Sequence, residues 1–325
     1  MIQAYVPVNG RCQSVEIGVN DRLPAGLLWV DLIDPTHAER AQVESFFSIE
    51  LPSYEEMQEI EQSSRFYVED GARYMTANIL TKADTPLPSN FPITFILAQG
   101  ALITLRQADP KPFRTYAARL PRLSPGPANG DEVLVGLLEA FVQRIADVLE
   151  KVAADMDGWS RASFAERRGH GPELQAVLRD LGRSEELASL SRETLVGLGR
   201  VVRFMAPRAP ETGDKKMFRD QRALVRTLVS DIMALSEHAE FESHKVSFLL
   251  DATLGMINIE QSRIIKLFSV VATVFLPPTL VASIYGMNFK IMPELEWAMG
   301  YPWALALMLL SAVLPIVYFR RKGWF

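Results

Sequence analysis

Cysteine is nearly absent from this chain, with Cys12 as the single example among 325 residues. One cysteine cannot form an intrachain disulfide or a thiolate metal cluster. Such scarcity is typical of a chain whose soluble part lies in a reducing cytosol. Residues 1–4 also lack the basic segment and apolar core of a secretory signal peptide, so we expect none.

The chain also lacks the common motifs of enzymes. It contains no glycine-rich phosphate loop, no pattern that pairs a nucleophile with a base, and no spaced set of metal ligands. These absences leave an enzymatic function without support and argue against transport driven by ATP hydrolysis. We therefore expect no catalytic residues and no cofactor.

Acidic side chains outnumber basic ones before the last part of the chain. The sequence has 34 basic and 39 acidic side chains, and residues 264–325 hold five of the basic ones and two of the acidic ones. Residues 1–263 therefore have a net charge of −8, which argues against a nucleic-acid surface. An acidic domain is compatible with attraction of cations, although acidity serves only solubility in most soluble domains.

Long hydrophobic runs dominate the end of the chain. The first covers residues 264–285, with Lys266 as its only charge, and the second covers residues 302–319 with no charge. A helix of ~20 residues crosses a hydrocarbon core of ~30 Å, so each run is long enough to span a membrane. The sequence therefore predicts a membrane protein with two spans, joined by a loop over residues 286–301.

The basic residues beside the two spans predict their orientation. Arg320, Arg321 and Lys322 follow the second span, whereas Arg263 and Lys266 flank the first. The connecting loop has one basic residue and two acidic ones. Because basic residues are retained on the cytosolic side, both termini are expected in the cytosol and the loop outside.

The beginning of the chain has the pattern of a mixed α/β domain. An apolar run over residues 27–33 is typical of a buried strand. Asp34-Pro35-Thr36 follows it and predicts a helix over residues 37–47, with Asp34 as its cap and a proline at its start. Two β-hairpins are expected where strand-like runs flank Asp70-Gly71 and Gln99-Gly100.

From residue 131 onward the apolar residues recur at helical spacing. They predict helices over residues 133–168 and 172–205, and then a third that begins after Gly213. Between residue 214 and Pro277 there is no proline, and the only glycine is Gly255. That stretch predicts a helix of ~64 residues, or ~95 Å at 1.5 Å per residue, which continues as a stalk into the first span.

These patterns predict three parts in each subunit. Residues 1–125 form an α/β cytosolic domain, and residues 126–263 form cytosolic helices that include the long stalk helix. Residues 264–325 form a transmembrane region with two C-terminal transmembrane helices.

The residues that follow the first span resemble those of one known family. Tyr285-Gly286-Met287-Asn288-Phe289 is followed by Met292-Pro293-Glu294-Leu295 and by Gly300-Tyr301-Pro302. This succession, between two terminal spans, is similar to that of the CorA family of divalent-cation channels. The resemblance extends to Trp29-Val30-Asp31-Leu32 in the cytosolic domain and to the basic end of the chain, but its specificity lies after Ile264.

The resemblance implies a funnel-shaped homopentamer in the lipids of a bacterial-type inner or plasma membrane, with the first spans lining a central pore. Gly286, Met287 and Asn288 would form the selectivity filter at the outer mouth, with Asn288 closest to the ion. Neutral amide oxygens can hydrogen-bond to the waters of hydrated Mg²⁺, an ion that loses water reluctantly. Glu294 and Glu296 on the outer loop would raise the local cation concentration. The alternative for Glu296 is an ion pair with Lys290 in the same loop.

The resemblance also implies which residues face the pore and where regulation occurs. Thr279 would offer a ring of hydroxyl oxygens, and the apolar residues would close the pore by dewetting. Asp251 matches a stalk carboxylate of relatives that bind a regulatory metal between subunits, whereas Thr227 stands where those relatives have an aspartate. The implied pore-facing set is Thr279, Leu276, Ala272, Phe268 and Ile265.

The implied function is channel-type uptake of hydrated Mg²⁺, and also of Co²⁺ or Ni²⁺. The membrane potential would drive it, because a divalent ion gains ~4.6 kcal/mol per 100 mV. Two alternatives stay open: a zinc transporter of the same fold, similar to the ZntB branch, and a membrane-anchored scaffold or sensor without flux. Met287 and the loop over residues 292–295 favour the magnesium branch. Asn288 has an alternative role as a helix C-cap in the left-handed conformation.

Overall fold

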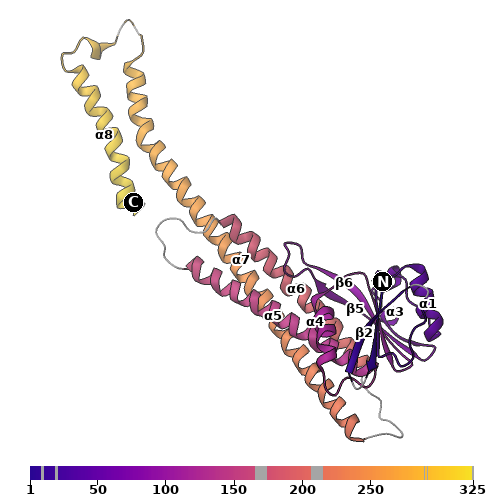
Figure 1. Ribbon diagram of the computed structural model, residues 1–325. Helices are drawn as coiled ribbons and strands as arrows, with labels where there is room; N and C mark the ends of the chain where they lie inside the picture. The colour runs from indigo at the N-terminus through magenta and orange to yellow at the C-terminus, as the bar shows by residue number, and fades with distance from the viewer. Residues whose placement is uncertain are drawn as a thin grey trace. The chain divides into compact units, whose positions relative to one another are not determined.

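The computed structural model describes residues 1–8, 11–18, 21–164, 174–205, 215–288, 290 and 292–323 (Figure 1). The chain divides into two compact units, Met1–Leu250 and Asp251–Phe325. Each unit is described by itself below.

A seven-stranded mixed sheet forms the centre of the first unit, in the order β2-β1-β3-β7-β6-β5-β4. β3 and β7 are parallel, and the other neighbouring strands are antiparallel. The predicted buried strand is confirmed as β3, all but the last of whose residues are buried. The strands are β1 (Ile2–Val8), β2 (Arg11–Ile17), β3 (Trp29–Ile33), β4 (Phe66–Glu69), β5 (Ala72–Thr81), β6 (Ser89–Ala98) and β7 (Ala101–Arg106).

Both predicted hairpins are present, and their turns explain the residues found in them. Asp70 and Gly71 join β4 to β5 with φ values of 48° and 77°. Gln99 and Gly100 join β6 to β7 with φ values of 50° and 80°. A two-residue turn of this kind needs positive φ at both central residues, which glycine adopts without strain.

The predicted helix over residues 37–47 is confirmed as α1 (His37–Phe47), but its cap is not the predicted aspartate. Thr36 is the N-cap and forms a capping box with Glu39, whose carboxylate accepts from the Thr36 backbone N–H at 2.8 Å. Asp34 instead has a positive φ of 42°, and its N–H donates to the carbonyl oxygen of Arg106. The aspartate therefore turns the chain out of the sheet before the helix begins.

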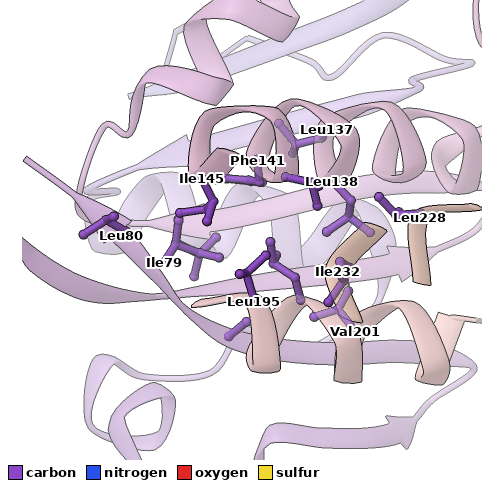
Figure 2. Packing of buried hydrophobic residues seen from close by; sticks show 14 of the residues in the cluster. Ile79, Leu80, Leu137, Leu138, Phe141, Ile145, Leu195, Val201, Leu228 and Ile232 are labelled. Carbon is purple, nitrogen blue, oxygen red and sulfur yellow. The ribbon is translucent and has the colours of Figure 1, made fainter. Parts of the chain in front are cut away.

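Hydrophobic side chains form two clusters, one on each face of the sheet. Neighbouring strand residues alternate between them, with Trp29 in one and Val30 in the other. The cluster that contains Val30 includes Val43 and Phe47 of α1. The other cluster lies under the remaining long helices, and Figure 2 shows side chains of β5, α5, α6 and α7 gathered in it. The helices of the first unit, besides α1, are α2 (Tyr54–Gln58), α3 (Gln62–Arg65), α4 (Lys111–Arg119), η1 (Leu120–Arg122), α5 (Gly130–Phe164), α6 (Leu174–Met205) and the first part of α7.

One buried ion pair joins the two parallel strands. Arg106 donates through Nη2 to Oδ2 of Asp31 at 2.8 Å and through Nε to Oδ1 at 3.0 Å. The hydroxyl of Thr104 donates to the same Oδ1 at 2.7 Å. Asp31 is 1% exposed and Arg106 is 2% exposed, so the pair is almost completely removed from water. Both charges are neutralised and hydrogen-bonded, as buried charges must be.

The predicted stalk helix is confirmed as α7 (Lys215–Tyr285), which continues through Pro277 and Pro278. Its residues from Asp251 onward belong to the second unit. The second span is confirmed as a helix, α8 (Gly300–Arg321), and the loop before it contains the short η2 (Pro293–Leu295).

Candidate functional site

Two helical segments of the chain are long and apolar enough to cross a membrane. They are the part of α7 that ends at Tyr285 and the whole of α8. Their large apolar side chains are mostly exposed, including Phe268 at 69%, Leu276 at 66% and Leu309 at 69%. A continuous apolar surface of this extent marks contact with lipid or with another protein surface.

The last turns of α7 have one less exposed side, here called the covered stripe. Val270 is 6% exposed, and the other members are half-buried. α8 has a similar side, which begins at the buried Ala304 and runs through Met308 and Ser311 to Phe319. Among the described residues the second unit contains these two helices and η2, so each helix covers the other on these sides. The covered stripe of α7 consists of Val270, Val274, Pro277, Pro278, Val281 and Tyr285.

The five residues predicted to face a pore lie on the opposite side of α7, here called the open stripe. Residues two positions apart on a helix differ by about 200°, so Leu276 points away from Val274 and Thr279 points away from Val281. All five are exposed. The open stripe consists of Ile265, Phe268, Ala272, Leu276 and Thr279, so the structure brings the predicted set onto one face.

Hydroxyl groups on α7 donate their protons to the helix backbone. Thr279 Oγ1 donates to the carbonyl oxygen of Phe275 at 2.7 Å, and Ser283 Oγ donates to that of Thr279 at 2.8 Å. With its proton engaged, each hydroxyl oxygen presents lone pairs, which can accept from the waters of a hydrated cation. Ser283 extends the open stripe by one turn beyond Thr279. The sequence prediction omitted it, although its spacing of four residues from Thr279 was a sufficient signal.

Gly286, Met287 and Asn288 come directly after the end of α7. The N–H of Gly286 donates to the carbonyl oxygen of Ala282 at 2.9 Å, and that of Met287 donates to Ile284 at 3.3 Å. These bonds close the last helical turn, and Asn288 follows it without further helical structure. Neither Gly286 nor Asn288 has a left-handed φ, so the alternative role of Asn288 as a left-handed C-cap is wrong. All three residues are exposed.

The loop over residues 286–301 is folded against the start of α8. Glu294 lies in η2, and Gly300 donates its N–H to the carbonyl oxygen of Trp297 at 2.8 Å. Glu294 and Glu296 are both exposed. Among the described residues of this loop, no ion pair joins Lys290 to either glutamate.

The predicted regulatory position stands apart from this site. Asp251 is exposed on α7, and the hydroxyl of Thr227 donates to the carbonyl oxygen of Ala223 at 3.2 Å. Within the described part of this single chain, no group of three or more His, Cys, Asp or Glu side chains is placed to hold a metal ion.

Comparisons with known proteins identify the family and the fold of the chain. Residues 24–321 match the family described as CorA-like Mg2+ transporter protein. The magnesium transport protein CorA of Pectobacterium atrosepticum is 38% identical, and that of Escherichia coli K12 is 36% identical, each over the whole of both chains. The structure of the CorA magnesium transporter from Methanocaldococcus jannaschii is similar over 100% of this chain and 99% of that one, with a TM-score of 0.72 and 19% identity.

The match extends across the α/β domain, the long helix and both apolar helices, so the fold of this chain is that of the full-length CorA structure. The relatives are transporters of magnesium and not enzymes. The candidate spans are therefore those of a membrane protein. On its motif, its fold and its similarity over the whole length, this chain belongs to the CorA-like Mg2+ transporter family.

Proposed function

We propose that this chain forms a channel through which hydrated Mg²⁺ enters the cell, with Co²⁺ and Ni²⁺ as further permeant ions. The observation that carries the proposal is the open stripe of α7. It faces away from the side that α8 covers, and it leads through Thr279 and Ser283 to Gly286-Met287-Asn288. Copies of α7 arranged around a symmetry axis would place this stripe on the wall of a common pore.

A homopentamer supplies the symmetry that the filter requires. One asparagine amide binds a hydrated ion weakly, whereas a ring of them surrounds its water shell with acceptor oxygens. Mg²⁺ retains its waters strongly, so a neutral ring admits the hydrated ion without stripping it or holding it too tightly. Asn288 is the innermost contact, and Gly286 and Met287 set its position at the end of the helix.

The open stripe below the filter combines a polar and an apolar zone. The hydroxyl oxygens of Thr279 and Ser283 continue the acceptor surface for about one helical turn. Leu276, Phe268 and Ile265, with Ala272 between them, form an apolar zone that excludes water when the pore is narrow. Dewetting of this zone closes the channel.

The orientation follows from charge. Both termini lie in the cytosol, and the outer loop faces the opposite side of the inner membrane, where Glu294 and Glu296 concentrate cations at the pore mouth. An inside-negative potential then drives entry. On the cytosolic side, Asp251 contributes a carboxylate to a regulatory Mg²⁺ site that neighbouring subunits complete.

Ion flux into proteoliposomes tests the proposal. Vesicles containing the full chain, with an inside-negative potential, are expected to take up Mg²⁺, and Asn288→Ala is expected to reduce the rate at least about tenfold, or ~1.4 kcal/mol of barrier. Asn288→Gln keeps the amide and separates loss of the acceptor from a change in its position. Size-exclusion chromatography of each variant verifies that the oligomer is retained.

Two results would contradict the proposal. Unchanged Mg²⁺ flux in Asn288→Ala would remove the filter from this residue. Zinc flux without magnesium flux would assign the chain to zinc transport instead.

A further inference from the structure

A groove of about 920 Å³ opens in the first unit between α3, α6 and α7, next to the start of β4. Leu195 of α6 and Ile232 of α7, which Figure 2 labels in the core, form its buried floor. The rings of Phe66 and Phe204 lie along it with their centroids 5.8 Å apart. Met233 also lines the groove and is 53% exposed, so the floor continues as an apolar surface. Grooves of this size, with apolar floors, are the usual binding sites of small organic molecules.

Arginines surround this apolar floor. Arg200 and Arg203 are exposed on α6 and line the groove, one helical turn apart. Arg65 follows the groove residues Gln62 and Ser63. Partial burial lowers the pKa of Arg65, the carboxylate of Glu193 raises it, and the charge of Arg200 lowers it, so the two guanidinium groups are close enough to interact.

The three arginines form no ion pair with any of the described residues. In the described part of the chain, no carboxylate lies within ion-pair distance of Arg65, Arg200 or Arg203. The nearby Glu193 instead accepts from Asn78 at 2.7 Å and from Asn90 at 2.8 Å. Glu237 of α7 is the one acidic residue among the described residues of the lining. The groove therefore has an excess of positive charge along an apolar floor.

We propose that this groove binds a small organic phosphate with an aromatic body, of the class of the nucleoside phosphates. The aromatic part lies on Phe66, Phe204 and Met233, and the phosphates pair with Arg200 and Arg203. Guanidinium groups bind phosphate oxygens through paired hydrogen bonds, and aromatic rings stack on apolar and aromatic side chains. The site is distinct from the pore, and it binds its ligand without hydrolysing it.

Binding requires both halves of the ligand, and this distinguishes the site from a surface that attracts any anion. Phosphate charge without an aromatic body leaves the floor uncovered, and an aromatic body without charge leaves the arginines without partners. The affinity should increase with each added phosphate, because each adds acceptors for the same two guanidinium groups.

Isothermal titration of the full chain in detergent tests the proposal, in EDTA so that metal chelation by the ligand does not contribute. The probes are ATP, AMP, adenosine and inorganic pyrophosphate. We expect saturable binding of ATP and weaker binding of AMP. Adenosine and pyrophosphate should each bind at least about tenfold more weakly than ATP. Equal binding of pyrophosphate and ATP would assign the groove to inorganic anions and overturn the proposal.

The double variant Arg200→Gln/Arg203→Gln should weaken ATP binding at least about tenfold, since each hydrogen bond to a charged group is individually strong. Arg192→Gln is the matched control, because Arg192 is also exposed on α6 but pairs with Glu240 at 3.1 Å outside the groove. Met233→Gln tests the floor without a change of charge and should weaken the binding of ATP more than the binding of pyrophosphate.

Unchanged binding in the double variant, or absence of saturable ATP binding, would refute the site. A change in oligomer mass without nucleotide binding would identify the groove as a face between subunits. None of these readouts depends on ion flux.

Discussion

Gly300 lies so close to Glu294 that a side chain at position 300 would overlap the backbone of the loop. A Cβ atom built on Gly300 would be 2.1 Å from the carbonyl oxygen of Glu294. Gly300, the first residue of α8, can therefore approach η2 this closely only because it has no side chain. This close approach fixes the position of the Glu294 backbone relative to the start of α8.

Replacement of Gly300 by alanine should therefore displace the loop and reduce Mg²⁺ uptake. Because the clash is with backbone and not with a flexible side chain, the loop must shift to relieve it. Uptake by transport-deficient cells measures the effect. Gly255→Ala is the control, since Gly255 lies within α7 with no atom within 4 Å of its virtual Cβ. Equal uptake by the two variants would show that the loop position is not needed.

Removal of the Thr279 hydroxyl should slow Mg²⁺ flux without preventing assembly. Thr279→Val keeps the shape of the side chain and removes the acceptor oxygen from the open stripe, so we expect a reduction of several-fold to about tenfold. Thr273→Val is the matched control. The Thr273 hydroxyl also donates to the helix backbone, at 2.7 Å from the carbonyl oxygen of Ser269, but Thr273 lies outside the open stripe. Proteoliposome flux should fall in the first variant and be retained in the second.

The pair of Asp31 and Arg106 should be costly to break from either side. Arg106→Met leaves the buried carboxylate of Asp31 without an ion-pair partner, and we expect a loss of ~3–5 kcal/mol in the free energy of unfolding. Asp31→Asn should cost less than that, because Arg106 keeps its ion pair with Asp109 at 2.8 Å. Arg192→Met, which breaks an exposed pair, should cost less than ~1 kcal/mol. Urea unfolding of the full chain, followed by circular dichroism, compares them. The double variant Asp31→Leu/Arg106→Met should recover part of the loss, and failure to do so would assign the cost to packing.

Acid stability should depend on Asp84. Hydrogen bonds from Lys111 Nζ and Arg144 Nη2 hold the pKa of Asp84 below its usual value, although burial opposes them. A lowered folded-state pKa contributes stability that is present above the unfolded value and is lost as the pH falls through the folded value. The difference in unfolding midpoint between the native chain and Asp84→Asn should therefore be constant near neutral pH and vanish in acid. A difference that persists in acid would mean that the charge of Asp84 is not its cause.

Much of this architecture could be predicted from residues that act on the local backbone conformation. Asp70-Gly71 and Gln99-Gly100 identified their hairpins, and the lack of proline before Pro277 identified the long helix. The predicted N-cap of α1 was wrong, because the side chains of both Asp34 and Thr36 can cap a helix. Only the tertiary fold, in which the N–H of Asp34 bonds to Arg106, decides between them. The strands β1 and β2 were not predicted, although Asn9-Gly10 between them is itself a sequence that favours hairpins.

The candidate site divides in the same way. The residues of the open stripe followed from a resemblance, and their place on a pore wall stays a prediction. Ser283 was omitted, although its spacing of four residues from Thr279 places it on the same face of α7. The groove beside Arg200 could not have been predicted, since its lining comes from α3, β4, α6 and α7, which only the tertiary fold brings together.

The two opposite stripes of α7 also predict different effects in a cell for substitutions in its last turns. A bulky or polar replacement at Val274 would clash with α8 of the same chain. It should therefore lower the amount of folded protein, and other subunits could not restore it. The same replacement at Leu276, half a turn away, should leave each chain folded and act only within the proposed homopentamer. In cells that make both mutant and normal chains, a replacement at Leu276 should therefore reduce transport by the normal chains as well. A replacement at Val274 should remove only the mutant chains and leave transport by the normal ones.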